Sequence, residues 1–279
     1  MDYSATGIAY DFALPTSGGG TLRARAQVDL PADGHDRMAW PQGPEGWLGR
    51  VGWVLPCRYD INTLGSTASV AVAVKSAAGA EEKLIEQSTT ARAHVESNHG
   101  RAFPASWVWV QAADGVGRSL IAVGGRFKIG FLTVPTWIVA YRAPTLNPED
   151  DWSFRTTDVA LTRCTSTRLS PPTAVGAEEA SLRLTLQKKR RFDMLRWKSR
   201  RRQLVLELDV RADTLDFFQD RLNVPTPKGF STTPGCAEAF GAAATVRAYV
   251  VQGGTRRLVD EATLSQAALE FGGAHLVPE

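Results

Sequence analysis

Hydrophobic and polar residues alternate with a period of two along much of the chain. The clearest runs are 21–30, 180–187 and 203–210, in which apolar residues occupy every second position. Because side chains two apart point to the same face of a strand, each run predicts a half-buried strand. Turns rich in Gly and Pro separate many such short runs, and amphipathic helical periodicity is nearly absent. The pattern therefore predicts an all-β fold, an antiparallel barrel or sandwich.

A few segments depart from this strand pattern. Asp213 to Leu222 has some helical character, Asp60 to Ser66 is typical of a turn, and Pro225 to Pro234 is typical of a loop. Pro135 interrupts the apolar run 126–141. Since Pro cannot donate a ladder hydrogen bond, it indicates an edge, a bulge or a break in that strand.

The segment 143–151 (APTLNPEDD) combines two Pro with three acidic residues, a composition typical of a joint. It predicts two consecutive β halves. The N-terminal barrel-like half would comprise residues 1–144, and the C-terminal barrel-like half residues 145–279.

The stretch 94–111 (HVESNHGRAFPASWVWVQ) concentrates the candidate chemistry. Alternate residues of its first part can share one strand face, namely His94, Glu96 and Asn98. After a turn, alternate residues of its second part can share another face, namely Trp107, Trp109 and Gln111. If both faces line one interior cavity, a titratable wall lies opposite an aromatic one, which suits an apolar small molecule. The alternative is a hairpin whose Trp pair fills the core while its polar residues face water.

Composition adds few constraints. The chain has 279 residues, 43% hydrophobic and 22% charged, and a net charge of +3 that implies no particular partner. Its three cysteines are widely spaced, so neither a disulfide framework nor a zinc site is indicated. The N-terminal sequence lacks a signal-peptide pattern. No window reaches the roughly 18 apolar residues of a membrane helix. We therefore expect a cytoplasmic protein without stable membrane insertion.

Several familiar chemistries lack their motifs here. There is no GxGxxG before a helix, no Walker loop, no GxSxG and no HExxH. His94, Glu96 and His99 could hold a metal, but their spacing is not diagnostic, so neither a metal nor a cofactor is predicted. The basic run 188–202 around Trp197 could bind the phosphate groups of a nucleic acid. We favour a solvated hairpin instead and predict no nucleic-acid partner.

The sequence resembles the tocopherol cyclase-like family over roughly residues 46–273. The resemblance rests first on a Glu-containing stretch followed by Phe-Pro and Trp-any-Trp-any-Gln, matched here by Glu96, Asn98, Gly100, Phe103, Pro104, Trp107, Trp109 and Gln111. The segment 52–65 is similar to a proline-rich, cysteine-containing segment of the family. Matches follow downstream at Leu222, Pro225, Gly229, Glu238 and Gly241, and the segment 267–273 (AALEFGG) is similar to the family's tail.

This resemblance implies lipocalin-like β-barrels with a deep apolar pocket and a cofactor-free cyclase activity. The chain differs from the family pattern at the catalytic stretch, since Ser97 stands in place of a lysine and His99 in place of a tryptophan. The family's histidine-glycine after the cysteine corresponds to Tyr59 and Asp60.

We hypothesise a cofactor-independent intramolecular cyclase of natural-product biosynthesis that acts on an apolar polyene or prenylated intermediate. Confinement lowers the barrier to ring closure, and a pericyclic, Diels–Alder-type reaction is favoured slightly over proton-initiated closure. The predicted catalytic residues are Glu96, His99 and His94. The predicted substrate-binding residues are Asn98, Phe103, Trp107, Trp109, Gln111, Tyr59, Asp60, Trp53 and Trp137. The alternative function is a non-catalytic carrier of a lipophilic small molecule.

Overall fold

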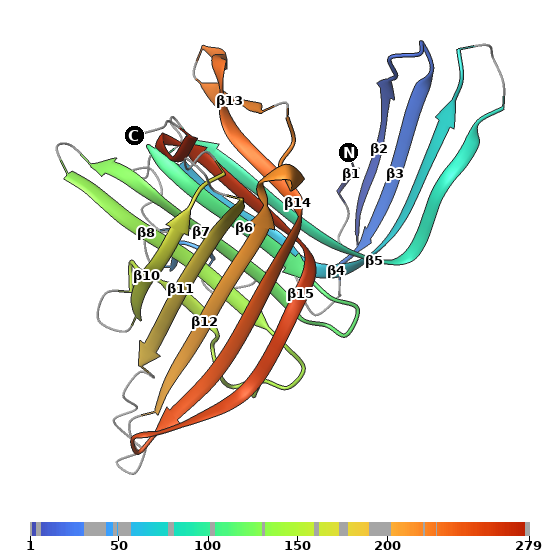
Figure 1. The fold of residues 1–279 in the computed structure, drawn as a ribbon. Helices are drawn as coiled ribbons and strands as arrows, with labels where there is room; N and C mark the ends of the chain where they lie inside the picture. Colours follow the sequence, from blue (N-terminus) through green and yellow to red (C-terminus); the bar gives the residue numbers. More distant parts are fainter. Residues whose placement is uncertain are drawn as a thin grey trace. The chain divides into compact units, whose positions relative to one another are not determined.

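The computed structural model describes most of the chain. The residues described are 2–3, 7–30, 43–46, 49, 57–77, 81–100, 104–129, 132–158, 162–172, 178–189, 202–219, 221–226 and 228–276. About three quarters of them form strands, which pair antiparallel, so the predicted all-β class is confirmed (Figure 1). Among these residues, no helix has the length and apolar character that crossing a bilayer requires.

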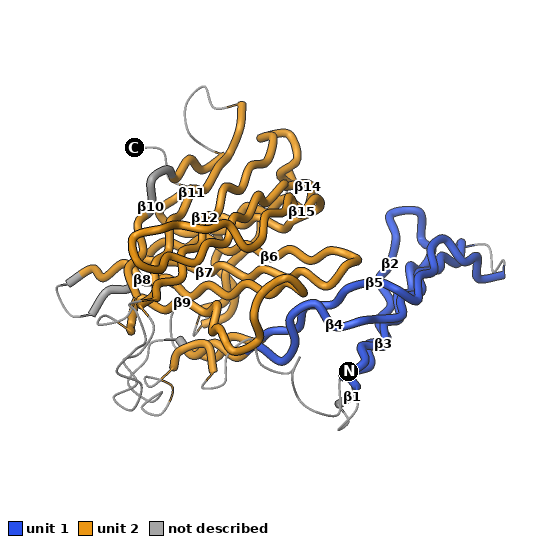
Figure 2. The backbone as a smooth tube through the Cα atoms, turned by 90° about the horizontal axis from the view of Figure 1, so that it is seen from below, with its two compact units in different colours: residues 1–39, 61–96 blue, residues 40–60, 97–279 orange. Residues whose placement is uncertain are grey.

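The chain forms two compact units (Figure 2). The first unit comprises residues 1–39 and 61–96, and the second comprises residues 40–60 and 97–279. The joint expected near residue 144 lies inside the second unit, in the turn between two strands that pair with each other.

A five-stranded sheet forms the body of the first unit, with its strands in the order β1-β2-β3-β4-β5. Its strands are β1 (Asp2–Tyr3), β2 (Gly7–Pro15), β3 (Thr21–Asp29), β4 (Cys57–Lys75) and β5 (Lys83–Gly100). The alternation in 21–30 places Val28 in the buried cluster with Ile8 and Ala68. On the opposite face Arg23 and Arg25 bind Asp11, at 3.0 and 3.2 Å.

A ten-stranded sheet forms the body of the second unit, in the order β10-β11-β12-β14-β15-β6-β7-β8-β9, with β13 paired to β14. The strands of its first half in sequence are β6 (Ser106–Ala113), β7 (Ser119–Ile129), β8 (Leu132–Arg142), β9 (Ser153–Arg155) and β10 (Thr162–Ser170). The remaining ones are β11 (Glu179–Lys189), β12 (Arg202–Asp213), β13 (Leu222–Thr226), β14 (Gly229–Gln252) and β15 (Thr255–Gly273). Two 3-10 turns, η2 (Thr214–Asp216) and η3 (Ala274–Leu276), follow β12 and β15.

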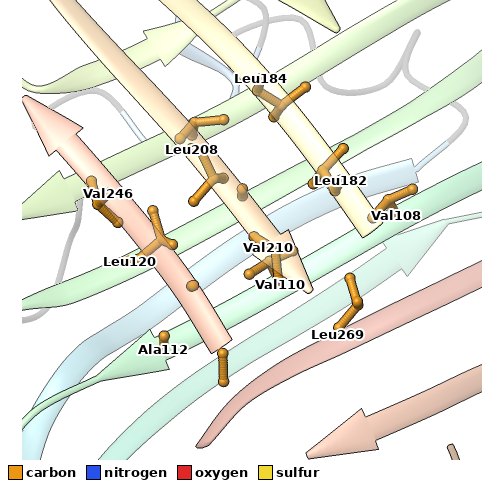
Figure 3. Close-up of a cluster of buried hydrophobic side chains, with 14 of the residues drawn as sticks. Val108, Val110, Ala112, Leu120, Leu182, Leu184, Leu208, Val210, Val246 and Leu269 are labelled. Carbon is orange, nitrogen blue, oxygen red and sulfur yellow. The ribbon is translucent and has the colours of Figure 1, made fainter. Parts of the chain in front are cut away.

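The sheet of the second unit curls into a nearly closed barrel. One side chain in two along each strand points into it, and the resulting cluster of Val, Leu, Ala and Phe side chains is almost wholly buried (Figure 3). Leu182, Leu184 and Leu186 of β11 show the alternation directly, because each is completely buried while Arg183 between them is exposed. The interior is therefore a packed hydrophobic core.

Side-chain contacts link the two ends of the barrel sheet. Lys188 on β11 donates to the Asp151 carboxylate at 2.5 Å and to the backbone carbonyl of Ser153, at the start of β9, at 2.7 Å. Arg202 at the start of β12 donates to Asp150 at 2.5 Å, and the Asp150 side chain is only 3% exposed. Ion pairs thus hold β11 and β12 to the β8–β9 turn.

Three local predictions were wrong. Residues 60–66 are not a turn but part of the long strand β4. The helical character expected at 213–222 is limited to η2, in which the Asp213 side chain accepts from Leu215 N at 2.9 Å. Residues 225–226 and 229–234 belong to the paired strands β13 and β14, because cross-strand pairing can retain prolines at exposed positions of a two-stranded extension.

The interruption expected at Pro135 proves to be an exposed position within β8. Pro135 pairs with Arg126 of β7, whereas β9 pairs only with residues 138–140 of β8. In the described part of the sheet, Pro135 therefore lies where β8 has a free edge, which is one of the alternatives that its missing N–H predicted.

Candidate functional site

The two tryptophans of the sequence WVWVQ lie on the outer face of the barrel. Val108, Val110 and Ala112 of β6 belong to the buried core. Alternation then directs Trp107, Trp109 and Gln111 to the opposite face, so the prediction that these three share a face is confirmed. The expectation that they line the barrel interior was wrong. Both alternating sets of β6 are apolar, so periodicity alone does not tell which set is inside.

The strand register places acidic residues beside these aromatic ones. Glu270 of β15 lies directly opposite Trp109, and Gly272 lies opposite Trp107. On the next strand, β14, Glu238 lies opposite Glu270. We call this outer surface of β14, β15 and β6 the acidic–aromatic face, comprising Trp107, Trp109, Gln111, Cys236, Glu238 and Glu270.

An irregularity in β14 directs Glu238 outward. The residues of β14 that belong to the barrel core are Ala237 and Ala239 before the irregularity and Ala242, Ala244, Val246, Ala248 and Val250 after it. The inward set therefore changes from odd to even positions, and the β14–β15 register shifts between Ala239 and Ala242. Such a bulge re-aims the side chains of one strand segment relative to the other. Here it places Cys236 and Glu238 on the outer face.

Hydrogen bonds connect the members of this face. The Trp107 indole Nε1 donates to the Glu270 carboxylate from the neighbouring strand. The position opposite Trp107 is Gly272, and a Cβ there would lie 2.0 Å from the indole ring. The glycine therefore leaves the space in which the Trp107 ring lies, and the ring is held against the sheet with only 7% of Trp107 exposed.

The surroundings of Glu238 change its pKa. Burial, a hydrogen bond to Glu270 and the charge of Glu270 raise the pKa of Glu238 to about 7. The Trp107 indole N–H donates to a side-chain oxygen of Glu270, which ties that side chain to β6. With a pKa near 7, Glu238 can both give up and take back a proton at neutral pH.

A thiol completes the cluster. The Cys236 sulfur and one oxygen of each glutamate all lie within 4.8 Å of one another. Burial, together with the charge of Glu270, raises the pKa of Cys236 far above its usual range. Three potential metal ligands converge in this way nowhere else in the described part of the chain. A metal would bind the thiolate and the two carboxylates in their ionised forms, and the cation would itself lower the pKa of each ligand.

Two of the predicted catalytic residues meet on β5 of the first unit. His94 Nε2 lies 2.5 Å from Glu96 Oε2, and the two side chains are 5% and 19% exposed. This contact confirms that alternate residues of the stretch share a face. The third, His99, and the predicted binding residue Asn98 are exposed near the end of the same strand.

The other predicted binding residues are dispersed. Tyr59 is buried, and its backbone N–H donates to the Glu45 carboxylate at 2.7 Å. Asp60 pairs with Arg58 at 3.4 Å on the surface. Trp137 lies on the inward side of β8, packed against the core and over Gly124. Trp53 lies outside the described residues, as does Phe103.

Sequence reasoning missed Cys236, Glu238 and Glu270 as site residues. Glu238 was noted only as a match to a family pattern, and Glu270 lies within the segment AALEFGG near the C-terminus. The sequence could have predicted only one part of this cluster. Cys236 and Glu238 are two residues apart in a strand and therefore share a face. Their meeting with Glu270 depends on the β14–β15 register, which one-dimensional patterns do not contain.

Comparison with known proteins adds no relative. No protein-family model matches this chain, and no curated protein matches it.

Proposed function

We propose that the protein is a cofactor-independent intramolecular cyclase that starts ring closure of an apolar, prenylated substrate by proton transfer from Glu238. The observation that carries this proposal is the carboxyl pair beside Trp107, in which the pKa of Glu238 is raised to about 7. An acid with a pKa near the working pH is both protonated and able to donate. We favour protonation over the pericyclic reaction because a hydrogen-bonded acid lies beside the aromatic side chains.

The reaction balances without an added reagent. Glu238 gives its proton to one carbon of a substrate alkene, and the alkene π electrons form the new C–H bond. A hydroxyl of the same molecule then bonds to the resulting carbocation and closes an ether ring. The hydroxyl proton returns to the carboxyl pair, so substrate and product have equal mass.

Besides an acid, this reaction needs groups that stabilise the carbocation and hold the substrate chain in place, and the aromatic residues can do both. A carbocation is stabilised by the face of an indole ring, and an apolar surface holds a flexible chain in a reactive conformation. Trp107 and Trp109 lie on the same face as Glu238, within two strands of it. Gln111 on that face can hydrogen-bond the polar end of a substrate.

The Glu238→Gln variant tests the acid. With a prenylated hydroquinone as probe, we expect the wild-type protein to form a cyclic product of unchanged mass, and the variant to lose this activity by about a hundredfold or more. Mass spectrometry in D₂O supplies the decisive reading. Proton-initiated closure incorporates one deuterium on carbon, whereas a pericyclic closure incorporates none. Glu261→Gln, which alters an exposed glutamate of the neighbouring strand β15, is the matched control.

The pH dependence gives an independent reading. Because the protonated form of Glu238 is the active one, the rate should be constant below about pH 7 and fall about tenfold per pH unit above it. Two outcomes would contradict the proposal. Equal turnover by Glu238→Gln would exclude Glu238 as the acid. Binding of the probe, seen as quenching of Trp fluorescence, without any product would instead identify a carrier.

A further inference from the structure

The β13–β14 hairpin presents an exposed apolar tip. Phe230 is 72% exposed, and Pro225 directly opposite it is exposed as well. Leu222, at the base of β13, is 49% exposed. Figure 1 shows the hairpin projecting from one end of the barrel. A large aromatic side chain so exposed at the end of a hairpin is an unfavourable arrangement in water and points to a partner.

The tip is ordered by hydrogen bonds of its own. Thr226 Oγ1 donates to the Gly229 carbonyl at 2.7 Å and accepts from Lys228 N at 3.2 Å. Val224 N donates to Ser231 Oγ at 2.8 Å across the hairpin. These contacts hold the backbone around Lys228 and Phe230 in place, so that little backbone conformational entropy is lost when the tip binds a surface.

The charges of the hairpin all have one sign. Between residues 221 and 235 the only charged residues are Arg221 and Lys228, and both are exposed. A protein partner with a neutral apolar surface would leave these cations unpaired. An anionic lipid surface pairs them with headgroup phosphates while it takes up the aromatic ring, and aromatic and basic side chains are the types enriched at such interfaces.

We propose that this hairpin docks the protein on anionic lipid surfaces. The tip residues Pro225, Lys228 and Phe230 enter the headgroup region, and the barrel remains in water. The same strand, β14, leads from Phe230 to Glu238 over about 25 Å of extended chain. Docking would thus bring the acidic–aromatic face close to a reservoir of apolar molecules, a consequence that rests on the proposed cyclase function.

Vesicle sedimentation with the full-length protein tests this docking. We expect binding to vesicles of phosphatidylcholine mixed with phosphatidylglycerol, weaker binding to phosphatidylcholine alone, and release at high salt. Phe230→Ser should lower the vesicle affinity about tenfold, and Lys228→Gln about fivefold on anionic vesicles only. Lys228→Arg should bind as the wild type does. Val116→Ser, which removes an apolar side chain that is 64% exposed in the turn at the far end of β6, is the matched control.

Two results would overturn the proposal. One is absence of vesicle binding, or equal binding by the wild type and Phe230→Ser. The other is a change of oligomeric state on Phe230→Ser in analytical ultracentrifugation without lipid binding, which would assign the hairpin to self-association. Failure of the cyclase proposal remains distinguishable, because Glu238→Gln should keep vesicle binding while Phe230→Ser keeps turnover of a detergent-dispersed probe.

Discussion

A single carboxyl that holds its proton near neutral pH is the basis of the proposed chemistry at the scale of residues. Glu238 alone in water would ionise near its ordinary pKa. Its neighbours change this, because burial and Glu270 favour the neutral form. The Trp107 indole in turn donates a hydrogen bond to Glu270. Side chains from two neighbouring strands therefore define the surroundings of the Glu238 carboxyl.

This arrangement predicts a specific pH dependence of stability. The folded-state pKa of Glu238, about 7, lies above the ordinary glutamate value of 4.5, so folding favours the protonated form. The associated stability is fully present below about pH 4.5 and is lost as the pH rises towards 7. Because the side chain is partly exposed to solvent, we expect the contribution to be only about 1 kcal/mol.

Urea unfolding of the wild type and of Glu270→Gln across this pH range measures the effect. The variant removes the charge and the carboxyl partner that raise the pKa of Glu238, so its loss of stability should end at a lower pH. Glu238→Gln should remove this component of the pH dependence altogether. Identical curves for the three proteins would show that Glu238 and Glu270 are not coupled.

At the scale of elements, glycines opposite tryptophans shape the sheet. Gly272 of β15 faces Trp107 of β6, and Gly124 of β7 faces Trp137 of β8. A Cβ on either glycine would come within 2.2 Å of the facing indole ring. Each ring therefore lies flat across the neighbouring strand. For Trp107 this position brings its Nε1 within reach of Glu270.

Gly272→Ala tests this cross-strand packing. The added methyl must displace the Trp107 ring, so we expect a loss of about 1–3 kcal/mol in unfolding free energy. The hydrogen bond to Glu270 should weaken as well, which the Trp fluorescence spectrum would report. Gly115→Ala serves as control, because a Cβ at that turn position meets no atom within 4 Å. Equal stability of the two variants would contradict the packing described.

The elements also show how far the sequence predicts the structure. Strict alternation in 180–187 and 203–210 identified β11 and β12 and their inward leucines, because one face is apolar and the other polar. In WVWVQ both faces are apolar, and the same reasoning failed to choose the inner one. The Val side chains occupy the core, whereas the Trp107 indole lies over Gly272 on the outer face.

The candidate site was predictable only in part. His94 and Glu96 are two residues apart, so their contact follows from strand geometry alone. Glu238 and Glu270 are far apart in the sequence and meet through the antiparallel register of two long strands. Composition and motifs contain no information about that register. The pairing therefore becomes visible only in three dimensions.

At the scale of the whole second unit, the barrel is held together at its open seam by charged side chains. Asp150 and Arg202 form an ion pair in which the carboxylate is almost fully buried. Asp151 pairs with Lys188 next to it. The acidic segment 143–151, which the sequence predicts to be a joint, provides the anions of this seam.

Arg202→Met tests the contribution of the seam. Loss of the cation leaves the buried Asp150 carboxylate without its partner, and we expect a cost of about 3 kcal/mol in chemical unfolding. Arg247→Met, which breaks an exposed pair with Glu261, should cost less than about 1 kcal/mol. A small effect for Arg202→Met would mean that the barrel does not depend on this ion pair.

The irregularity between Ala239 and Ala242 makes the site sensitive to residue count. Removing one residue there would leave Glu238 five positions before Ala244, so uninterrupted alternation would keep Glu238 outside and Ala244 inside. Removing two residues would leave Glu238 an even number of positions from Ala244, and regular pairing would then turn its carboxyl into the hydrocarbon interior. A two-residue deletion at this point should therefore be far more harmful than a one-residue deletion, so spacing as well as residue type encodes the site.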